Sequence, residues 1–309
     1  MLELKNKNLK AVFHKNGARL ISLIIDGVDV VFGNPPDMDV AVAEASAGSV
    51  VGRFAGRITK AQYELDGQLV KLIPNRGDFQ LHGGPQNFGN QDWATSVDGN
   101  SITFKFHSPD GDQGFPGEVQ AQAVYTLDDD RLKLAITATT TKPTAINLTN
   151  HAYWNMVGQG AGQDSIFAQE LQINASAYLP LSPELLPSGE IRDVKDSRMD
   201  FRALRKINEA YDNCYCLDGM RGVLKHGLIL RDPISGRRLD VYTTEAAIQM
   251  YTAIHWDGSL RSNHGKMLNH QALAIEPQNY PDAPNHKNFP SCILRPSEIY
   301  RNEMEWRFS

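Results

Sequence analysis

The sequence predicts an all-β protein built as a large antiparallel β-sandwich. Short runs rich in β-branched or alternating apolar residues recur along the whole chain, and Asp-Gly pairs stand between several of them. Asp-Gly between such runs is typical of a β-hairpin, because both residues tolerate positive φ. A helical spacing of apolar residues is found in residues 202–211, which predict about two turns of helix.

The expected strands follow one another as hairpins. Their residue ranges, in chain order, are 19–25 with 28–32, 62–65 with 68–73, 93–97 with 101–107, 119–127 with 131–141, and 228–232 with 237–244, followed by single strands at 271–276 and 298–308. The 119–127 run places Val119, Ala121, Ala123, Tyr125 and Leu127 on one face. A sheet with one packed face and one wetter face is typical of a sandwich.

Composition narrows the class of protein. The chain has 309 residues, is 41% hydrophobic and 22% charged, and carries a net charge of −5, which is typical of a soluble globular protein. No Pro/Ser/Gly-rich linker is present, so we expect one domain over 1–309. Its oligomeric state, monomer or homodimer, stays open. The mild acidity argues against a nucleic-acid or anionic-membrane partner, since both need clustered Lys and Arg.

The sequence also bears on compartment. The N-terminal residues carry charges where a secretory signal has an apolar core, and no stretch of about 18 apolar residues exists. Cysteines are few and odd in number: Cys214, Cys216 and Cys292. This count favours a reducing compartment, so we expect a cytoplasmic protein with free thiols.

Several chemistries lack their motifs. The sequence contains no Gly-rich loop ending in Lys-Ser/Thr, no GxGxxG, no GxSxG and no HExxH. We therefore predict no nucleotide, no resident metal and no other cofactor. A zinc site assembled from distant loops remains an open alternative.

Two distant segments carry groups suited to proton transfer. NLTNHAYWN (147–155) presents His151 among asparagines and aromatic residues, and AIEPQNYPDAPNHKNFPS (274–291) presents Glu276 after an apolar run. Imidazole and carboxyl groups are readily tuned to exchange protons near neutral pH. The alternatives are a buried or capping histidine for His151 and a strand-end ion pair for Glu276.

Other polar residues are weaker candidates from local sequence alone. His82 lies in LHGG (81–84), whose glycines let the backbone approach a ligand closely. Arg57 and Arg53 share GRFAGRI, and we expect one to face a site and the other a surface carboxylate. Further candidates with ordinary turn or strand alternatives are Asp212 and Gln249; Trp154, Tyr280 and Phe289 are candidates either for stacking on a sugar ring or for packing.

Taken together, these segments resemble the aldose 1-epimerase (galactose mutarotase) family. GRFAGRI, LHGG, GFPG, NLTNHAYWN, YDN, IQMYT and AIEPQNYPDAPNHKNFPS occur in the family's order from about residue 10 to the C-terminus. The resemblance implies the galactose mutarotase-like supersandwich. It also implies that His151 protonates the ring oxygen of the sugar and Glu276 removes the anomeric proton. The residues that it implies hydrogen-bond the other hydroxyls are Arg57, His82, Asp212 and Gln249.

The chain departs from the family pattern at a few positions. Gly56 stands where Asn is usual, Asn213 where His is frequent, and Pro277 where Thr is usual. These departures leave sugar preference open. Alternatives to a mutarotase are a non-catalytic sugar sensor, a hexose-phosphate 1-epimerase using both Arg53 and Arg57, and a glycosidase pairing Glu276 with Asp212.

Overall fold

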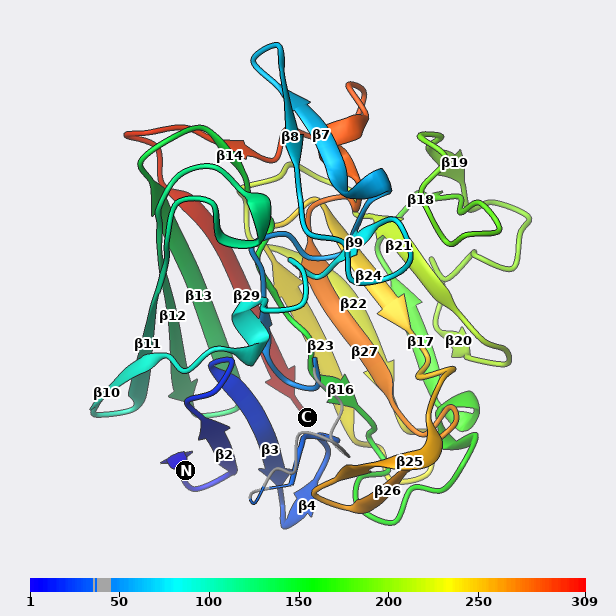
Figure 1. The fold of residues 1–309 in the computed structure, drawn as a ribbon. Helices are drawn as coiled ribbons and strands as arrows, with labels where there is room; N and C mark the ends of the chain where they lie inside the picture. The colour runs from blue at the N-terminus through cyan, green and yellow to red at the C-terminus, as the bar shows by residue number, and fades with distance from the viewer. Residues whose placement is uncertain (36, 38–45) are drawn as a thin grey trace.

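The fold is seen in a computed structural model that describes residues 1–35, 37 and 46–309 (Figure 1). The expected all-β class is confirmed. Every strand pairing in the sheets is antiparallel, and the helical turns of the described residues are short 3-10 turns, namely η1 (Thr59–Ala61), η2 (Phe88–Asn90), η3 (Asp112–Gly114), η4 (Ser165–Ala168) and η5 (Ala283–Asn285).

Two large sheets form the body of the molecule. The first has nine strands, in the order β10 (Ala94–Asp98), β11 (Ser101–Ser108), β12 (Val119–Asp128), β13 (Arg131–Thr140), β29 (Tyr300–Phe308), β23 (Arg238–Thr243), β22 (Lys225–Arg231), β17 (Glu170–Ile173) and β20 (Arg205–Lys206). The second has six, in the order β16 (Tyr153–Trp154), β27 (Leu273–Gln278), β24 (Ala247–Tyr251), β21 (Asp212–Cys216), β18 (Ala177–Leu179) and β19 (Arg192–Asp193).

Smaller sheets surround these two. The N-terminal segment forms a four-stranded sheet of β1 (Leu2–Lys5), β2 (Leu9–His14), β3 (Arg19–Ile25) and β4 (Val28–Asp29). The remaining strands pair in twos, as β5 (Val50–Val51) with β15 (Thr149–Asn150), β6 (Arg57–Ile58) with β9 (Gln80–Leu81), β7 (Gln62–Leu65) with β8 (Gln68–Lys71), β14 (Thr144–Ala145) with β28 (Ile293–Leu294), and β25 (Asp257–Ser262) with β26 (Gly265–Leu268).

The hydrophobic core lies between the two large sheets. Tyr125 and Trp306 of the nine-stranded sheet belong to the same buried cluster as Tyr215, Ile248 and Ile275 of the six-stranded sheet. The alternation predicted for β12 is confirmed, because its burial alternates strictly along Val119–Leu127. Successive side chains of a strand point to opposite faces of a sheet. Because Ile275 of β27 faces the core, Ala274 and Glu276 on either side of it point to the outer face.

Most hairpins form as expected, but the predicted helix over 202–211 is wrong. Asp26-Gly27 and Asp66-Gly67 are two-residue turns with positive φ at all four residues. Residues 205–206 instead form β20, which pairs with β17 through Leu171↔Arg205. A two-turn helix is marginal alone, so pairing with an existing sheet edge outweighs the local helical spacing.

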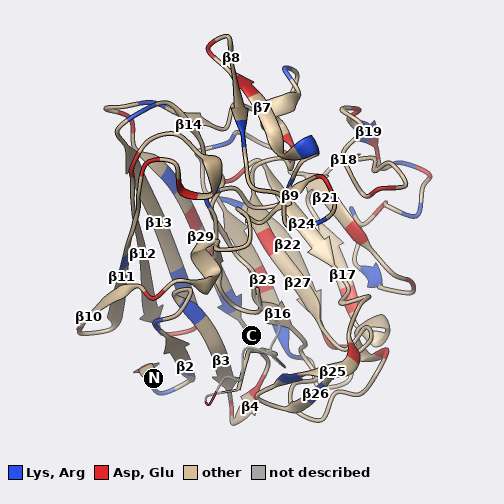
Figure 2. Cartoon of the chain, in the orientation of Figure 1, with Lys and Arg blue, Asp and Glu red and all other residues tan. Residues whose placement is uncertain are grey.

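Charge and cysteine placement follow the expectations from composition. Basic and acidic residues are interspersed over the fold, without a continuous basic region in this view (Figure 2). Cys214, Cys216 and Cys292 are free, as expected, and all three are buried. Within the described part of the chain, no helix has the length and apolar character needed to cross a bilayer.

Candidate active site

The floor of the candidate site is the outer face of the six-stranded sheet. Register pairs Gln249 on β24 with Glu276 on β27, and pairs Asp212 on β21 with Tyr251 on β24. Directly paired residues of an antiparallel sheet point to the same face. Three polar side chains from three strands therefore gather over one patch, although Asp212 and Glu276 are 64 positions apart in sequence.

His151 reaches this floor from the connection between β15 and β16. Its backbone is fixed on both sides, because its N–H donates to Ser49 O at 2.9 Å and its carbonyl accepts from Gly48 N at 2.8 Å. The neighbouring Asn150 donates to Gly48 O and to the hydroxyl of Tyr125. The asparagines of this segment therefore hold the backbone that carries His151 rather than bonding its ring.

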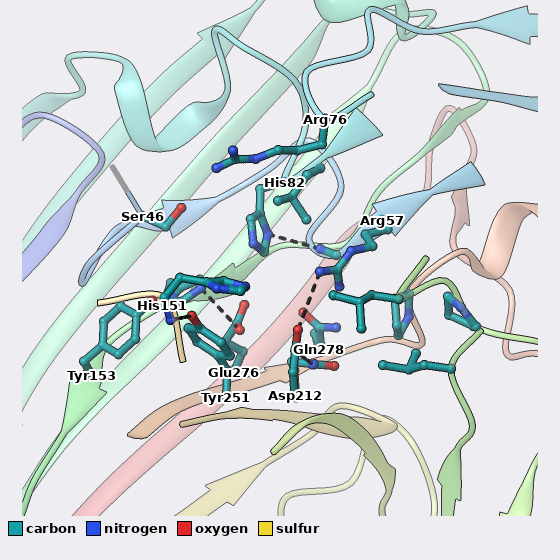
Figure 3. A pocket seen from close by; sticks show the side chains of 18 residues that line it. Ser46, Arg57, Arg76, His82, His151, Tyr153, Asp212, Tyr251, Glu276 and Gln278 are labelled. Carbon is teal, nitrogen blue, oxygen red and sulfur yellow. Dashed lines mark hydrogen bonds and ion pairs between the residues drawn. The ribbon is translucent and has the colours of Figure 1, made fainter. Parts of the chain in front are cut away.

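His151 and Glu276 meet at the bottom of the pocket (Figure 3). His151 Nε2 lies 3.4 Å from Glu276 Oε1, and the two residues are 4% and 2% exposed. Burial lowers the pKa of His151 to about 4, because the interior disfavours the charged imidazolium. In the unliganded protein the imidazole is therefore neutral at pH 7.

His82 stands over this pair and is held by Gly56. The Gly56 N–H donates to His82 Nδ1 at 3.2 Å, so the proton of the neutral ring lies on Nε2. The ring meets His151 edge-on, with centroids 5.3 Å apart. Burial, aided by the nearby His151 and Arg57, lowers the pKa of His82 well below its usual value. His82 is thus a neutral hydrogen-bond donor.

The glycines after His82 serve a different purpose from the one expected. A Cβ on Gly83 would lie 2.2 Å from the carbonyl oxygen of Gly52, and Gly83 has φ +89°. The glycine therefore allows two backbone segments, rather than a backbone and a ligand, to approach closely. This close packing sets the position of His82 above the floor.

His82, His151 and Glu276 also bring together atoms that could ligate a metal ion. A nitrogen of His82, a nitrogen of His151 and an oxygen of Glu276 lie within 4.8 Å of one another, which is the donor set of some zinc enzymes. Metal binding at His82 Nε2 requires a proton on Nδ1 or an anionic ring. Because Nδ1 accepts from Gly56 N–H, the arrangement suits proton transfer better than metal binding.

The other end of the pocket is a connected polar group. Gln249 Nε2 donates to Asp212 Oδ1 at 2.6 Å, and Arg57 pairs with Asp212 Oδ2 at 3.5 Å. Arg57 comes from β6, which pairs with β9 just before His82. The small β6–β9 ribbon therefore carries both Arg57 and His82 to the site. All six expected site residues line one pocket.

Other residues that line the pocket were not predicted from the sequence. The polar ones are Ser46, Arg76, Tyr251, His255 and Gln278, and an apolar wall is made by Leu181, Leu185 and Pro187. Gln278 could have been found from strand alternation, since it stands two residues after Glu276. The loop residues have no local signal that places them at a pocket.

One expectation about a neighbouring residue is corrected, and one open alternative is resolved. Arg53 does not face a surface carboxylate, because its guanidinium is buried and donates to the carbonyls of Pro116 and Gly117 and to Ser108 Oγ. For the three aromatic candidates the packing alternative holds. Trp154 packs on Trp306 in the core, Tyr280 packs on Phe289, and none of them lines the pocket.

Comparison with known proteins identifies the family. A family model described as aldose 1-epimerase matches residues 1–307. The chain belongs to the aldose 1-epimerase family. It is 36% identical to the galactose mutarotase of Bos taurus over 271 residues, which cover 85% of this chain and 78% of that protein. It is 34% identical to the aldose 1-epimerase of Escherichia coli K12 over 280 residues, covering 85% and 80%.

Solved structures agree with this family assignment. The aldose epimerase homologue from C. elegans superposes with a TM-score of 0.90 at 30% identity, covering 100% of this chain and 98% of that one. Galactose 1-epimerase from Lactobacillus acidophilus superposes with a TM-score of 0.86 at 25% identity, covering 99% and 93%. The fold is thus that of galactose mutarotase-like proteins, and the chain is an enzyme of the carbohydrate isomerase class.

Proposed function

We propose that this enzyme interconverts the α and β anomers of free aldohexoses such as galactose and glucose. The observation that carries the proposal is the meeting of His151 Nε2 and Glu276 Oε1, 3.4 Å apart in a buried pocket. The anomeric hydroxyl and the ring oxygen of an aldose are bonded to one carbon. An acid and a base that serve both oxygens must therefore lie close together.

In the proposed reaction Glu276 takes the proton of the anomeric hydroxyl while His151 gives a proton to the ring oxygen. The bond between the anomeric carbon and the ring oxygen breaks, and the open aldehyde forms. Rotation about the bond between the first two carbons presents the other carbonyl face, and reclosure returns both protons. Each group contributes about 10²–10⁴ in rate by general acid–base catalysis.

The reaction requires one proton on the His151–Glu276 pair. Since burial keeps His151 neutral at pH 7 in the unliganded protein, the reaction as proposed requires the proton to be shared between the buried imidazole and carboxyl groups, which titrate as a pair. A pair carrying two protons has no base, and a pair carrying none has no acid. A bell-shaped dependence of the rate on pH follows.

The remaining polar residues are proposed to hold the sugar. His82 donates from Nε2 close to the reacting centre, while Arg57, Asp212 and Gln249 hydrogen-bond hydroxyls further along the ring. We also propose that the chain acts as one domain, as a monomer or homodimer in the cytoplasm, with a monosaccharide and no nucleic acid as its partner. The free cysteines support the cytoplasmic location, and the core shared by the two large sheets supports the single domain.

Polarimetry tests the proposal. Freshly dissolved α-anomers of galactose, glucose, xylose and arabinose should equilibrate faster with the enzyme than in buffer, and the ranking gives the preferred sugar. Sugar binding in calorimetry without faster equilibration would instead identify a sensor. A clear preference for glucose 6-phosphate over glucose would identify a hexose-phosphate epimerase.

A further inference from the structure

Gln278 is a buried amide that the proposed mechanism does not use. The residue is 1% exposed and lines the active-site pocket. Neither its Oε1 nor its Nε2 has a hydrogen-bond partner among residues 1–35, 37 and 46–309. An amide buried without partners is unfavourable, so its presence at a binding pocket points to a ligand group that completes it.

The framework places this amide accurately. Gln278 is two residues after Glu276 on β27, so both side chains point to the pocket face, roughly 6.6–6.8 Å apart along the strand. The preceding carbonyl, that of Pro277, accepts from Thr149 Oγ1 at 2.7 Å and from Asn302 Nδ2 at 3.1 Å. Rigid strands hold binding groups more precisely than loops do.

Gly56 leaves the amide uncovered on its upper side. A Cβ at position 56 would lie 3.6 Å from Gln278 Nε2 and 2.8 Å from Pro281 Cβ. Because residue 56 is glycine, it has no side chain that could cover the Gln278 amide. The neighbouring polar side chains Arg57, Asp212 and Gln249 bond one another instead.

From this we infer that Gln278 is a specificity-determining residue that binds one hydroxyl of the aldose, remote from the anomeric carbon. The inference rests on the proposed function. An amide offers both donors and an acceptor, and a hydroxyl is also both donor and acceptor, so one hydroxyl satisfies Oε1 and Nε2 together. An ionised carboxylate or phosphate can only accept hydrogen bonds. It would therefore leave the Oε1 acceptor of Gln278 facing a negative charge without a donor. The position therefore selects a neutral hydroxyl.

Gln278→Met tests the inference because it keeps the length of the side chain and removes its hydrogen bonds. The kcat/KM of galactose and glucose should fall about tenfold, as expected when a bound hydroxyl loses its partner. In a panel of 2-, 3-, 4- and 6-deoxy sugars, one should have the same low kcat/KM with the wild type and with Gln278→Met, because it already lacks the hydroxyl that Gln278 binds. The other deoxy sugars should fall in parallel with the parent.

Controls separate the possible failures. Gln120→Met, at an exposed glutamine on β12, should leave the kcat/KM of every sugar at its wild-type value. If the wild type accelerates no sugar, the proposed function fails. If the wild type is active but Gln278→Met has the wild-type kcat/KM for every parent and deoxy sugar, a water satisfies the amide. In that case the inference alone is overturned. Should Gln278→Met not fold, Gln278→Leu, which also removes both hydrogen-bonding atoms, gives the same test, with the same matching deoxy sugar expected to be insensitive.

Discussion

The two ends of the pocket are built differently. At the reacting end, His151 and Glu276 are almost completely buried and meet at 3.4 Å, longer than a normal hydrogen bond. At the other end, Gln249 Nε2 donates to Asp212 Oδ1 at 2.6 Å, and Arg57 forms an ion pair with Asp212 Oδ2 at 3.5 Å. The Gln249–Asp212 hydrogen bond is thus formed before substrate arrives, whereas His151 and Glu276 stand beyond ordinary hydrogen-bond distance from each other.

This difference separates binding from chemistry. Groups already bonded to one another are oriented in advance and offer the substrate a fixed pattern of donors and acceptors. A buried acid–base pair without a short mutual bond keeps its protons available for transfer. Substitutions at the first end should therefore affect mainly KM, and those at the second mainly kcat.

The largest expected effect comes from removing the base. Glu276→Gln keeps the shape of the side chain but cannot accept the anomeric proton, so kcat should fall about 10²–10⁴-fold, or roughly 3–5 kcal/mol of barrier. Sugar binding in calorimetry should change much less. Glu303→Gln, an exposed glutamate on β29, is the control and should retain full activity. A variant of Glu276 with activity within a few-fold of wild type would reject the base assignment.

A slightly smaller effect concerns stability and pH at the reacting end. The pKa of His151 is about 4 when folded, against 6.5 as the ordinary value, so the unfolded chain binds more protons between these limits. The free energy of unfolding is therefore highest above pH 6.5, where His151 is neutral in both states. It falls by roughly 3 kcal/mol in total as the pH drops from 6.5 toward 4.

Urea unfolding at pH 7 and pH 4.5 measures this loss. His151→Gln should lose less stability between the two pH values than the wild type does. His107→Gln, at an exposed histidine on β11, serves as the control and should behave like the wild type. Equal losses in the His151 variant and the wild type would show that the buried imidazole is not the group that titrates.

At the polar end a moderate effect is expected. Asp212→Asn removes the charge that pairs with Arg57 and weakens the orientation of Gln249. The KM for galactose should rise about tenfold, with kcat changed by less than about threefold, since these contacts are made equally before and during reaction. Asp98→Asn, an exposed residue on β10, is the comparison. A fall in kcat alone would contradict the division between the two ends.

The smallest effect is expected at the rim. Arg76 lines the pocket but is exposed, and no ion pair of its side chain occurs among the residues that the structure describes. Since solvent and salt screen such a charge, Arg76→Met should change kcat/KM for neutral sugars by less than about twofold. A large selective loss on glucose 6-phosphate would instead favour the hexose-phosphate alternative.

The fold could be predicted wherever local pattern and tertiary pairing agree. The β12–β13 hairpin was predictable because its alternation and its aspartate turn point to the same structure. The 28–32 strand is regular over Val28–Asp29 alone, because Phe32 N–H turns to the carbonyl of Tyr153. The short helix was mispredicted because a strand partner far along the chain determines the outcome.

The site was predictable in its residues more than in its geometry. Motifs singled out His151 and Glu276, and family resemblance supplied Arg57, His82, Asp212 and Gln249, while the distances between them depend on register across three strands. Arg53 was misjudged because the carbonyls that hold it lie in a separate loop, 63 and 64 residues away. Gln278 followed from alternation once β27 was known to continue through Pro277.

One strand, β27, serves the core and the pocket at once, with Ile275 in the packed interior and Glu276 in the site. A change that repacks Ile275 will therefore shift the catalytic carboxylate as well, so stability and turnover cannot be tuned separately there. New sugar preferences would evolve more readily in the surrounding loops, such as the segment from Leu181 to Pro187, which can vary without disturbing this shared strand.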